Sequence, residues 1–168
     1  MSVSLENVRF LVVDDNAHMV KLVKTILRGF GAEHVLEAKS GAEAFRCLKE
    51  DNIDIVVLDY LMNDEDGVAF VKRVRTSPDS TTPYVPIIML TAHSDRARVE
   101  VARDAGVTEF CAKPVTSANM LRKVAAVIDH PRPFVRSDDY FGPDRRRKDD
   151  PQYQGPERRK DRRDVAAD

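Results

Sequence analysis

The feature that most constrains the fold is a short apolar run that ends on an acid, residues 53–60 with the sequence IDIVVLDY. Four of these residues are Ile or Val, which is typical of a strand buried on both faces in a parallel sheet. Asp59 follows the apolar residues, and open α/β sheets place their chemistry just beyond the carboxyl ends of the strands. Taken alone, Asp59 fits the start of a polar turn better than a functional site. Its role can be predicted only together with motifs elsewhere in the chain.

Apolar runs of this kind alternate with amphipathic helical patterns along residues 8–128. The alternation predicts an α/β fold in which right-handed crossovers build a five-stranded parallel sheet, doubly wound with helices on both faces. Ser40, with Glu43 three residues later, has the pattern of a capping box, and Thr116 or Ser117 caps the last helix. The predicted strands are 8–13, 34–38, 53–60, 86–90 and 108–112, and the predicted helices cover about 19–27, 41–48, 68–75, 95–105 and 117–128.

The composition indicates the cellular compartment of the protein. The 168 residues have a net charge of −1 and two cysteines, Cys47 and Cys111, without metal-binding spacing, which favours a reducing, cytosolic setting. The first seven residues have no signal-peptide pattern, and no apolar run reaches the ~20 residues of a membrane span. We therefore expect a cytoplasmic protein without membrane insertion, with a folded domain over residues 1–131.

Polar residues at the strand ends should converge, because the carboxyl ends of parallel strands share one edge of the sheet. Asp14, Asp15 and Asp59 are three carboxylates that repel one another unless a hard divalent cation lies among them, and oxygen-only ligands suit Mg²⁺. Thr91 and Lys113, at the ends of the fourth and fifth strands, would hold the remaining oxygens of a phosphoryl group. This edge therefore predicts phosphorylation of one carboxylate.

Residues 8–128 resemble the receiver domain of bacterial two-component response regulators, which has a flavodoxin-like, CheY-like fold. The resemblance implies a signalling protein and not an enzyme, phosphorylated by a histidine kinase or a phosphotransfer protein. It rests on five motifs in the family's order, which are Asp14-Asp15, Asp59 with Met62 three residues on, Asp66-Gly67, Thr91-Ala92 and Lys113-Pro114.

The resemblance implies a role for each residue of the predicted pocket. Asp59 is the phosphoacceptor and a ligand of Mg²⁺, together with Asp14, Asp15 and the backbone carbonyl of Leu61. Lys113 pairs with the phosphoryl oxygens, and its peptide bond to the following proline is usually cis in the family.

The resemblance also implies a switch pair and shows some departures. Thr91 is the switch hydroxyl that moves toward the phosphoryl group, and Phe110 takes the position of the switch aromatic while also suiting an ordinary core position. Phe110 lacks the hydroxyl of the commoner Tyr, so it acts through packing. Asn63 stands where the family usually has Pro, so we expect a looser loop there. His93 could tune dephosphorylation, and it fits a solvent-exposed loop position equally well.

Residues 132–168 have a different composition, which predicts a disordered tail able to order on ligand binding. They contain almost no aliphatic side chains before Val165, so we expect no core there. An internal repeat distinguishes this tail from an inert one, because the motif Tyr-x-Gly-Pro-Asp/Glu-Arg-Arg begins at Tyr140 and again at Tyr153. The Gly-Pro step fixes a turn, so the Tyr, the acid and the arginines are presented twice in one arrangement.

The repeated side chains suit guanine. Arginine meets the O6/N7 edge of the base bidentately, the acid accepts from its N1 and N2 hydrogens, and tyrosine and guanidinium planes stack on its face. The remaining arginines neutralise phosphate. Cyclic di-GMP has two guanines and two phosphates and forms intercalated dimers, so it matches a doubled motif. The candidate binding residues are Tyr140, Asp144, Arg145, Arg146, Arg147, Tyr153, Glu157, Arg158, Arg159, Asp161, Arg162 and Arg163.

A receiver with such a tail resembles the Cle proteins, the CheY-like cyclic di-GMP effectors of alphaproteobacteria. The resemblance implies that the ligand binds the tail and that the protein then engages a flagellar motor switch protein at the flagellated pole, which reduces motility and promotes surface attachment. The alternative is a single-domain phospho-receiver that relays a histidine kinase signal and has an inert tail. DNA binding is disfavoured, because nine acidic residues interleave with eleven basic ones after Pro131.

Overall fold

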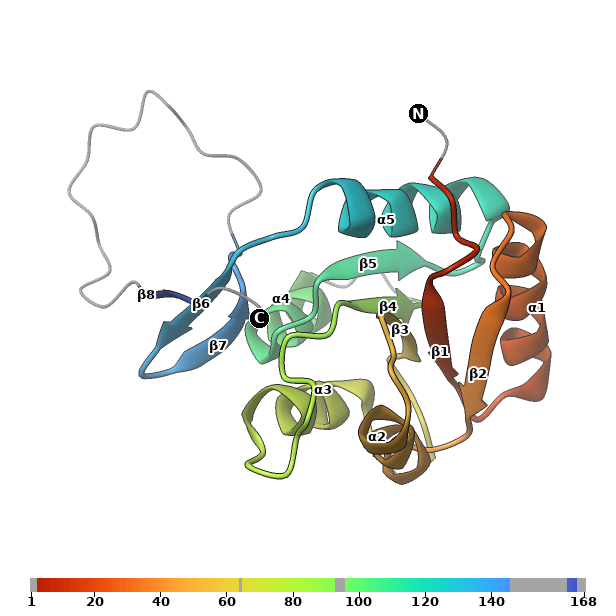
Figure 1. Cartoon of the computed structure of the whole chain (residues 1–168). Coiled ribbons are helices and arrows are strands. Elements are labelled where there is room, and N and C mark those ends of the chain that lie inside the picture. The colour runs from red at the N-terminus through yellow and green to blue at the C-terminus, as the bar shows by residue number, and fades with distance from the viewer. Residues whose placement is uncertain (1–2, 64, 93–95, 146–162, 166–168) are drawn as a thin grey trace.

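The computed structural model describes residues 3–63, 65–92 and 96–145, and the backbone of residues 163–165. Five parallel strands form a sheet in the order β2-β1-β3-β4-β5, with helices on both faces (Figure 1), which confirms the predicted fold class. The strands are β1 (Arg9–Val13), β2 (His34–Ala38), β3 (Ile55–Asp59), β4 (Ile87–Thr91) and β5 (Glu109–Ala112), and the helices are α1 (Ala17–Gly29), α2 (Gly41–Glu50), α3 (Gly67–Thr76), α4 (Arg96–Ala105) and α5 (Ser117–Asp129).

β3 lies at the centre of this sheet, and all five of its residues are buried. Val56 and Leu58 belong to the apolar core under α2, α3 and α4, whereas Ile55 and Val57 belong to the core under α1 and α5. Because successive strand residues point to opposite faces, a strand covered on both sides needs apolar residues throughout. Asp59 is the exception, and it stands where the strand reaches the edge of the sheet.

Side-chain caps fix where the helices begin. Ser40 Oγ accepts a hydrogen bond from the Glu43 backbone N–H at 3.1 Å, and Thr116 caps α5 by accepting from the backbone N–H of Asn119. Glu43 reaches back to the backbone N–H of Lys39 at 3.0 Å, one residue before the position that a capping box uses. Among the described residues, no helix has the length and apolar character that crossing a membrane requires.

Residues 134–143 form a β-hairpin beside α3 and α4, so the prediction that nothing after residue 131 packs into a core is wrong for this segment. β6 (Phe134–Ser137) pairs antiparallel with β7 (Tyr140–Pro143), and the backbone of β8 (Arg163–Val165) pairs with the other edge of β6.

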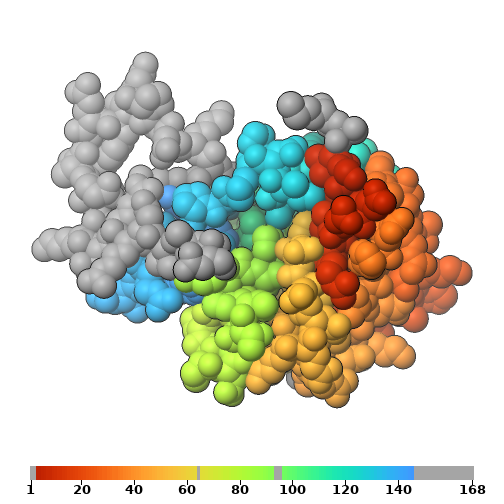
Figure 2. Space-filling view, in the orientation of Figure 1, coloured from red at the N-terminus to blue at the C-terminus, as the bar shows by residue number. Residues whose placement is uncertain are grey.

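Aromatic rings hold the hairpin to the domain. Phe134 and Phe141 are buried, and their ring centroids lie 5.1 and 5.4 Å from that of Tyr84 in the loop before β4. In the space-filling view the blue hairpin lies against this green loop (Figure 2). A count of aliphatic side chains misses the hairpin, because each aromatic ring buries as much apolar area as one or two aliphatic residues.

A buried arginine joins the hairpin to the domain. Arg75 in α3 is 3% exposed, and its guanidinium donates to the backbone carbonyls of Gly106, Pro83 and Val85 at 3.1, 2.9 and 2.6 Å. The guanidinium also lies 5.0 Å from the centroid of the Phe134 ring. Burial lowers the pKa of Arg75 to about 9, so the side chain stays charged at neutral pH.

Candidate functional site

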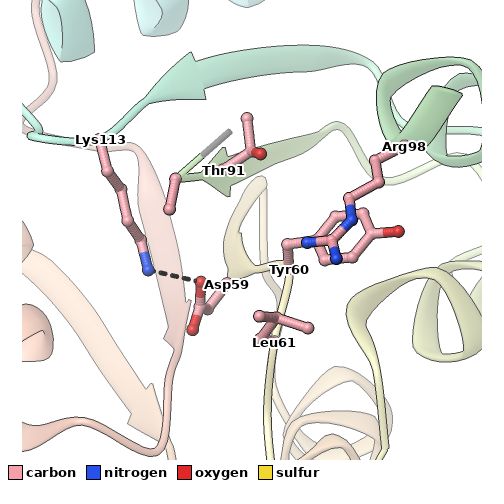
Figure 3. Close-up of a pocket in the computed structure, with 7 residues that line it drawn as sticks. Asp59, Tyr60, Leu61, Thr91, Arg98 and Lys113 are labelled. Carbon is pink, nitrogen blue, oxygen red and sulfur yellow. Dashed lines mark hydrogen bonds and ion pairs between the residues drawn. The ribbon is translucent and has the colours of Figure 1, made fainter. Parts of the chain in front are cut away.

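The carboxyl ends of four strands bring polar side chains to one edge of the sheet. Asp14 directly follows β1, Asp59 ends β3, Thr91 ends β4 and Lys113 directly follows β5. Asp59, Thr91 and Lys113 line one pocket, in which the lysine points toward the aspartate (Figure 3). The structure therefore brings together the residues that their strand-end positions predicted.

The three predicted acids form a tight cluster. One carboxylate oxygen from each of Asp14, Asp15 and Asp59 lies within 4.8 Å of the other two. Asp14 is 1% exposed and Asp59 is 6% exposed, whereas Asp15 is half-buried. Such a cluster concentrates negative charge at the edge of the sheet, away from most of the solvent that would screen it.

The hydrogen bonds and the pKa of Asp14 indicate which kind of ligand fits the cluster. Its Oδ1 accepts a hydrogen bond from the Asn16 backbone N–H at 2.9 Å, but its buried Oδ2 has no hydrogen-bond partner among the described residues. Burial raises the pKa of Asp14 to about 6, and the neighbouring charges of Asp59 and Asp15 act in the same direction. An orphaned carboxylate oxygen among three acids fits a small divalent cation with oxygen ligands, such as Mg²⁺.

Lys113 supplies the positive charge of the pocket. Its Nζ lies 2.8 Å from Asp59 Oδ1, and the side chain of Asp59 is only 8% exposed. The Lys113–Pro114 peptide bond is cis, as the resemblance implied. The pair places an ammonium group beside the carboxylate on which a phosphoryl group would be carried.

The loop after β3 makes one contact with the acidic cluster, at Asn63, where a looser loop is expected. The backbone N–H of Asn63 donates to Asp15 Oδ2 at 2.9 Å. A proline at this position has no N–H and could not make this bond. Leu61, whose carbonyl is a predicted Mg²⁺ ligand, lies in the same loop and has a side chain that is exposed.

Asp66 and Gly67 explain why α3 can begin directly beneath the pocket. Asp66 caps α3 by accepting from the Ala69 backbone N–H at 2.7 Å. A Cβ atom on Gly67 would lie 2.6 Å from the backbone carbonyl oxygen of Asp59, which is closer than van der Waals contact allows. The N–H of Gly67 donates to the carbonyl of Tyr60 at 2.8 Å, so only glycine permits this close approach.

Two residues that line the pocket, Tyr60 and Arg98, were not among the predicted site residues. The guanidinium carbon of Arg98 lies 5.8 Å from the centroid of the Tyr60 ring (Figure 3). Only their positions in the sequence could have indicated these two residues. Tyr60 follows the end of β3, and Arg98 lies in the first turn of α4, the helix after β4. The predicted residue His93 lies outside the described residues.

The two predicted switch residues lie on neighbouring strands. Thr91 is 8% exposed at the end of β4, and Phe110 is half-buried in β5, opposite Met89. Phe110 packs against the core under α2, α3 and α4, so its ordinary core role is observed.

Only part of the first copy of the tail motif, residues 140–145, lies in the described residues. Tyr140 and Asp144 are 7% and 6% exposed, and Arg145 packs its guanidinium over the Tyr140 ring. The backbone of Arg163 forms the start of β8. The remaining predicted ligand residues lie outside the described residues, namely Arg146, Arg147, Tyr153, Glu157, Arg158, Arg159, Asp161 and Arg162.

Known proteins are similar to this chain in sequence and in fold. Chemotaxis protein CheY-3 from Vibrio cholerae is 32% identical over 124 residues, which cover 74% of this chain and 94% of the relative. Chemotaxis protein CheY1 from Helicobacter pylori is 37% identical over 122 residues, which cover 71% of this chain and 96% of the relative. The solved structure of Vibrio cholerae chemotaxis protein CheY4 has a TM-score of 0.65 and 27% identity, and the match covers 71% of this chain and 98% of that one.

Residues 10–125 match the family described as the response regulator receiver domain. The chain belongs to this family, and its acidic pocket is that of a CheY-type receiver. The match ends before the hairpin and the arginine-rich tail, so these parts lie outside the shared domain.

Proposed function

We propose that this protein is a response regulator that accepts a phosphoryl group on Asp59 and binds cyclic di-GMP through its arginine-rich tail. The first half of the proposal rests on one observation, the arrangement of Asp59 between two further acids and the Lys113 ammonium. A nucleophilic carboxylate beside a cation site and a lysine is suited to phosphoryl transfer.

In the proposed reaction, a carboxylate oxygen of Asp59 attacks the phosphorus of a phosphodonor, and the bond to the donor's leaving group breaks. Lys113, now 2.8 Å from Asp59, pairs with an oxygen of the phosphoryl group. Asp14, Asp15, Asp59 and the Leu61 carbonyl would hold Mg²⁺, which neutralises charge on the transferred group. A histidine kinase or a phosphotransfer protein is the proposed donor.

The product is expected to act through Thr91 and Phe110. The Thr91 hydroxyl lines the same pocket as Asp59 and can donate a hydrogen bond to the new phosphoryl oxygens. A shift of Thr91 would leave space on the adjacent strand for a new rotamer of the half-buried Phe110. The proposed output is binding to a flagellar motor switch protein, in line with the chemotaxis names of the two relatives.

The test of the first half is labelling of the full chain by acetyl phosphate with Mg²⁺. We expect Asp59→Ala to abolish labelling, because among the described carboxylates of the cation site only Asp59 forms an ion pair with Lys113. Asp51→Ala at the end of α2 is the matched control and should label normally. Persistent labelling of Asp59→Ala would reject the assignment of Asp59.

The second half of the proposal rests on the repeated motif at Tyr140 and Tyr153. Two sets of arginine, acid and tyrosine match the two guanines and two phosphates of cyclic di-GMP. The bound protein would then be recruited to the flagellated pole, where it would reduce motility and promote surface attachment, as in the Cle proteins that the tail resembles.

Calorimetry of the full chain with cyclic di-GMP, against GTP and a DNA oligomer, tests this half. We expect heat only with cyclic di-GMP, and we expect Arg158→Ala combined with Arg159→Ala to abolish it while Asp59 still phosphorylates. The matched control is Arg28→Ala combined with Arg46→Ala, two exposed arginines of the receiver domain. Absence of heat with cyclic di-GMP would favour the alternative, a phospho-receiver with an inert tail.

A further inference from the structure

The first copy of the tail motif is held on the receiver domain by an ion pair with α4. Arg145 Nη1 lies 2.6 Å from Asp104 Oδ1, a short distance for a charge-assisted hydrogen bond. The side chains of Arg145 and Asp104 are 30% and 52% exposed. Asp104 is also 3.6 Å from the neighbouring Arg103 Nε, a longer and weaker contact.

The ring of Tyr140 packs against the guanidinium of Arg145. The guanidinium carbon of Arg145 lies 4.5 Å from the centroid of the Tyr140 ring, so the arginine stacks on the ring face. The Tyr140 hydroxyl donates to the Pro143 carbonyl at 2.6 Å, and the residue is only 7% exposed. Both the ring face and the hydroxyl of this tyrosine are therefore engaged within the domain.

Glycines allow the hairpin to lie this close to α4. A Cβ atom on Gly142 would lie 3.0 Å from the Cα of Gly106, at the end of α4, and 2.7 Å from the Tyr140 hydroxyl. The contact is therefore backbone against backbone, and it fixes where β7 leaves Arg145 relative to Asp104.

In this position Arg145 cannot present a planar fork to guanine. Bidentate recognition needs two parallel N–H groups, either Nη1 with Nη2 or Nε with Nη2. Nη1 already donates to Asp104, and Nε is buried without a hydrogen-bond partner among the described residues. Arg145 and Tyr140 can therefore meet a base only after the contact with Asp104 opens.

We propose that Asp104 is an affinity-determining residue of the cyclic di-GMP site, which competes with the ligand for Arg145. This inference rests on the proposed binding of cyclic di-GMP by the tail. Ligand binding releases Arg145 from α4, and by reciprocity any change that strengthens the Asp104 contact weakens ligand binding by the same factor. The contact thus couples the tail to a helix of the receiver domain.

The test is a double-mutant cycle on the full chain, with the dissociation constant for cyclic di-GMP measured by calorimetry. The four proteins are wild type, Asp104→Asn, Arg145→Ala and the double variant. We expect Asp104→Asn to tighten binding by about threefold, the factor typical of one partly exposed ion pair. In the Arg145→Ala background the same substitution should have no effect, because its partner is already absent.

A charge control separates the contact from the change in net charge, because cyclic di-GMP is an anion and Asp104→Asn removes one negative charge from the protein. Glu50→Gln in α2 makes the same change of charge on an exposed residue and should leave the dissociation constant unchanged. Equal tightening by Glu50→Gln, or by Asp104→Asn in both backgrounds, would overturn the inference.

The two proposals fail in different ways. If wild type gives no heat with cyclic di-GMP, the proposed function is wrong. If wild type binds and Asp104→Asn does not change its affinity, the proposed function stands and the competition by Asp104 is rejected, with the ligand held by the second copy of the motif.

Discussion

The two ends of the parallel sheet each hold a buried charged group, and the two groups differ in their surroundings, because Asp14 lies among other acids and Arg75 lies among backbone carbonyls. At the carboxyl ends of the strands, Asp14 is 1% exposed and keeps one carboxylate oxygen without a hydrogen bond among the described residues. At the opposite end, Arg75 is 3% exposed and donates to three backbone carbonyls. Burial moves the pKa of each group toward its neutral form, to about 6 and about 9 respectively.

This difference distinguishes a ligand-binding site, at Asp14, from a structural contact, at Arg75. An unsatisfied buried carboxylate among other acids is unfavourable until a cation arrives, so its free energy is available for binding. The Arg75 guanidinium lies among carbonyls of two loops and donates to three of them through Nε and Nη1, although its Nη2 has no partner among the described residues. These contacts need no ligand, and they hold the two loops and the hairpin in place. We therefore expect changes at Asp14 to alter ligand binding and changes at Arg75 to alter stability.

The largest effect on ligand binding should follow from Asp14→Asn. We expect Mg²⁺ affinity to fall at least tenfold, because a charged ligand of the metal is lost. In metal-free buffer at neutral pH, we expect the free energy of unfolding to rise by about 2 kcal/mol, because the burial penalty and the repulsion from Asp59 disappear. Urea unfolding and Mg²⁺ titration measure the two changes.

The exposed Glu50→Gln is the control for Asp14→Asn and should change neither quantity. A loss of stability in Asp14→Asn would show that Asp14 is a structural residue, as Arg75 is, and would remove the contrast between the two ends.

Arg75→Met should give the largest loss of stability. Three carbonyl oxygens lose their donor, two of them in buried hydrogen bonds, so we expect the free energy of unfolding to fall by about 3 kcal/mol. Mg²⁺ affinity should stay unchanged, because the metal site lies at the other end of the sheet. Lys72→Met on the exposed face of α3 is the control, and a fall in Mg²⁺ affinity with Arg75→Met would break the comparison.

Gly142→Ala tests how much the packing of the hairpin alone contributes to stability. The added methyl group would meet the Tyr140 hydroxyl at 2.7 Å and the Gly106 Cα at 3.0 Å, so the hairpin must shift. We expect a loss of about 1 to 2 kcal/mol in urea unfolding. Gly29→Ala, at a position with nothing within 4 Å, should instead leave stability equal or slightly higher.

Asn63→Pro should give the smallest effect. It removes the backbone N–H that donates to Asp15 Oδ2, so the carboxylate loses a group that orients it. We expect Mg²⁺ affinity to fall about threefold, the typical value of one exposed hydrogen bond. Asn63→Ala keeps the N–H and should bind Mg²⁺ as wild type does, and an equal loss in both variants would assign the effect to the asparagine side chain.

The same contrast explains what the sequence could predict. Asp14, Asp59, Thr91 and Lys113 each stand where an apolar run ends, and this local pattern locates them at one edge of any parallel sheet. The partners of Arg75 are backbone carbonyls, which every residue has, so no residue type in the sequence marks them. Burial of an arginine in α3 also contradicts its usual surface position.

The hairpin was not predicted, for a related reason. Its core consists of Phe134 and Phe141 from the tail and Tyr84 from a distant loop, and a scan for aliphatic periodicity does not detect such a cluster. Arg98 was missed because a single arginine in a helix has many possible roles, and only the fold places it beside Tyr60.

The placement of the aromatic rings gives the unmodified protein its own optical probes. The chain has four tyrosines and no tryptophan. Tyr60 lies at the pocket of Asp59 and Lys113 beside Arg98, whereas Tyr84 and Tyr140 lie in the packed contacts of the hairpin. Near-ultraviolet circular dichroism and tyrosine emission should therefore respond to events at either end of the sheet. Tyr60→Phe combined with Tyr153→Phe would leave only Tyr84 and Tyr140, so that the signal of the hairpin end could be recorded without an attached dye.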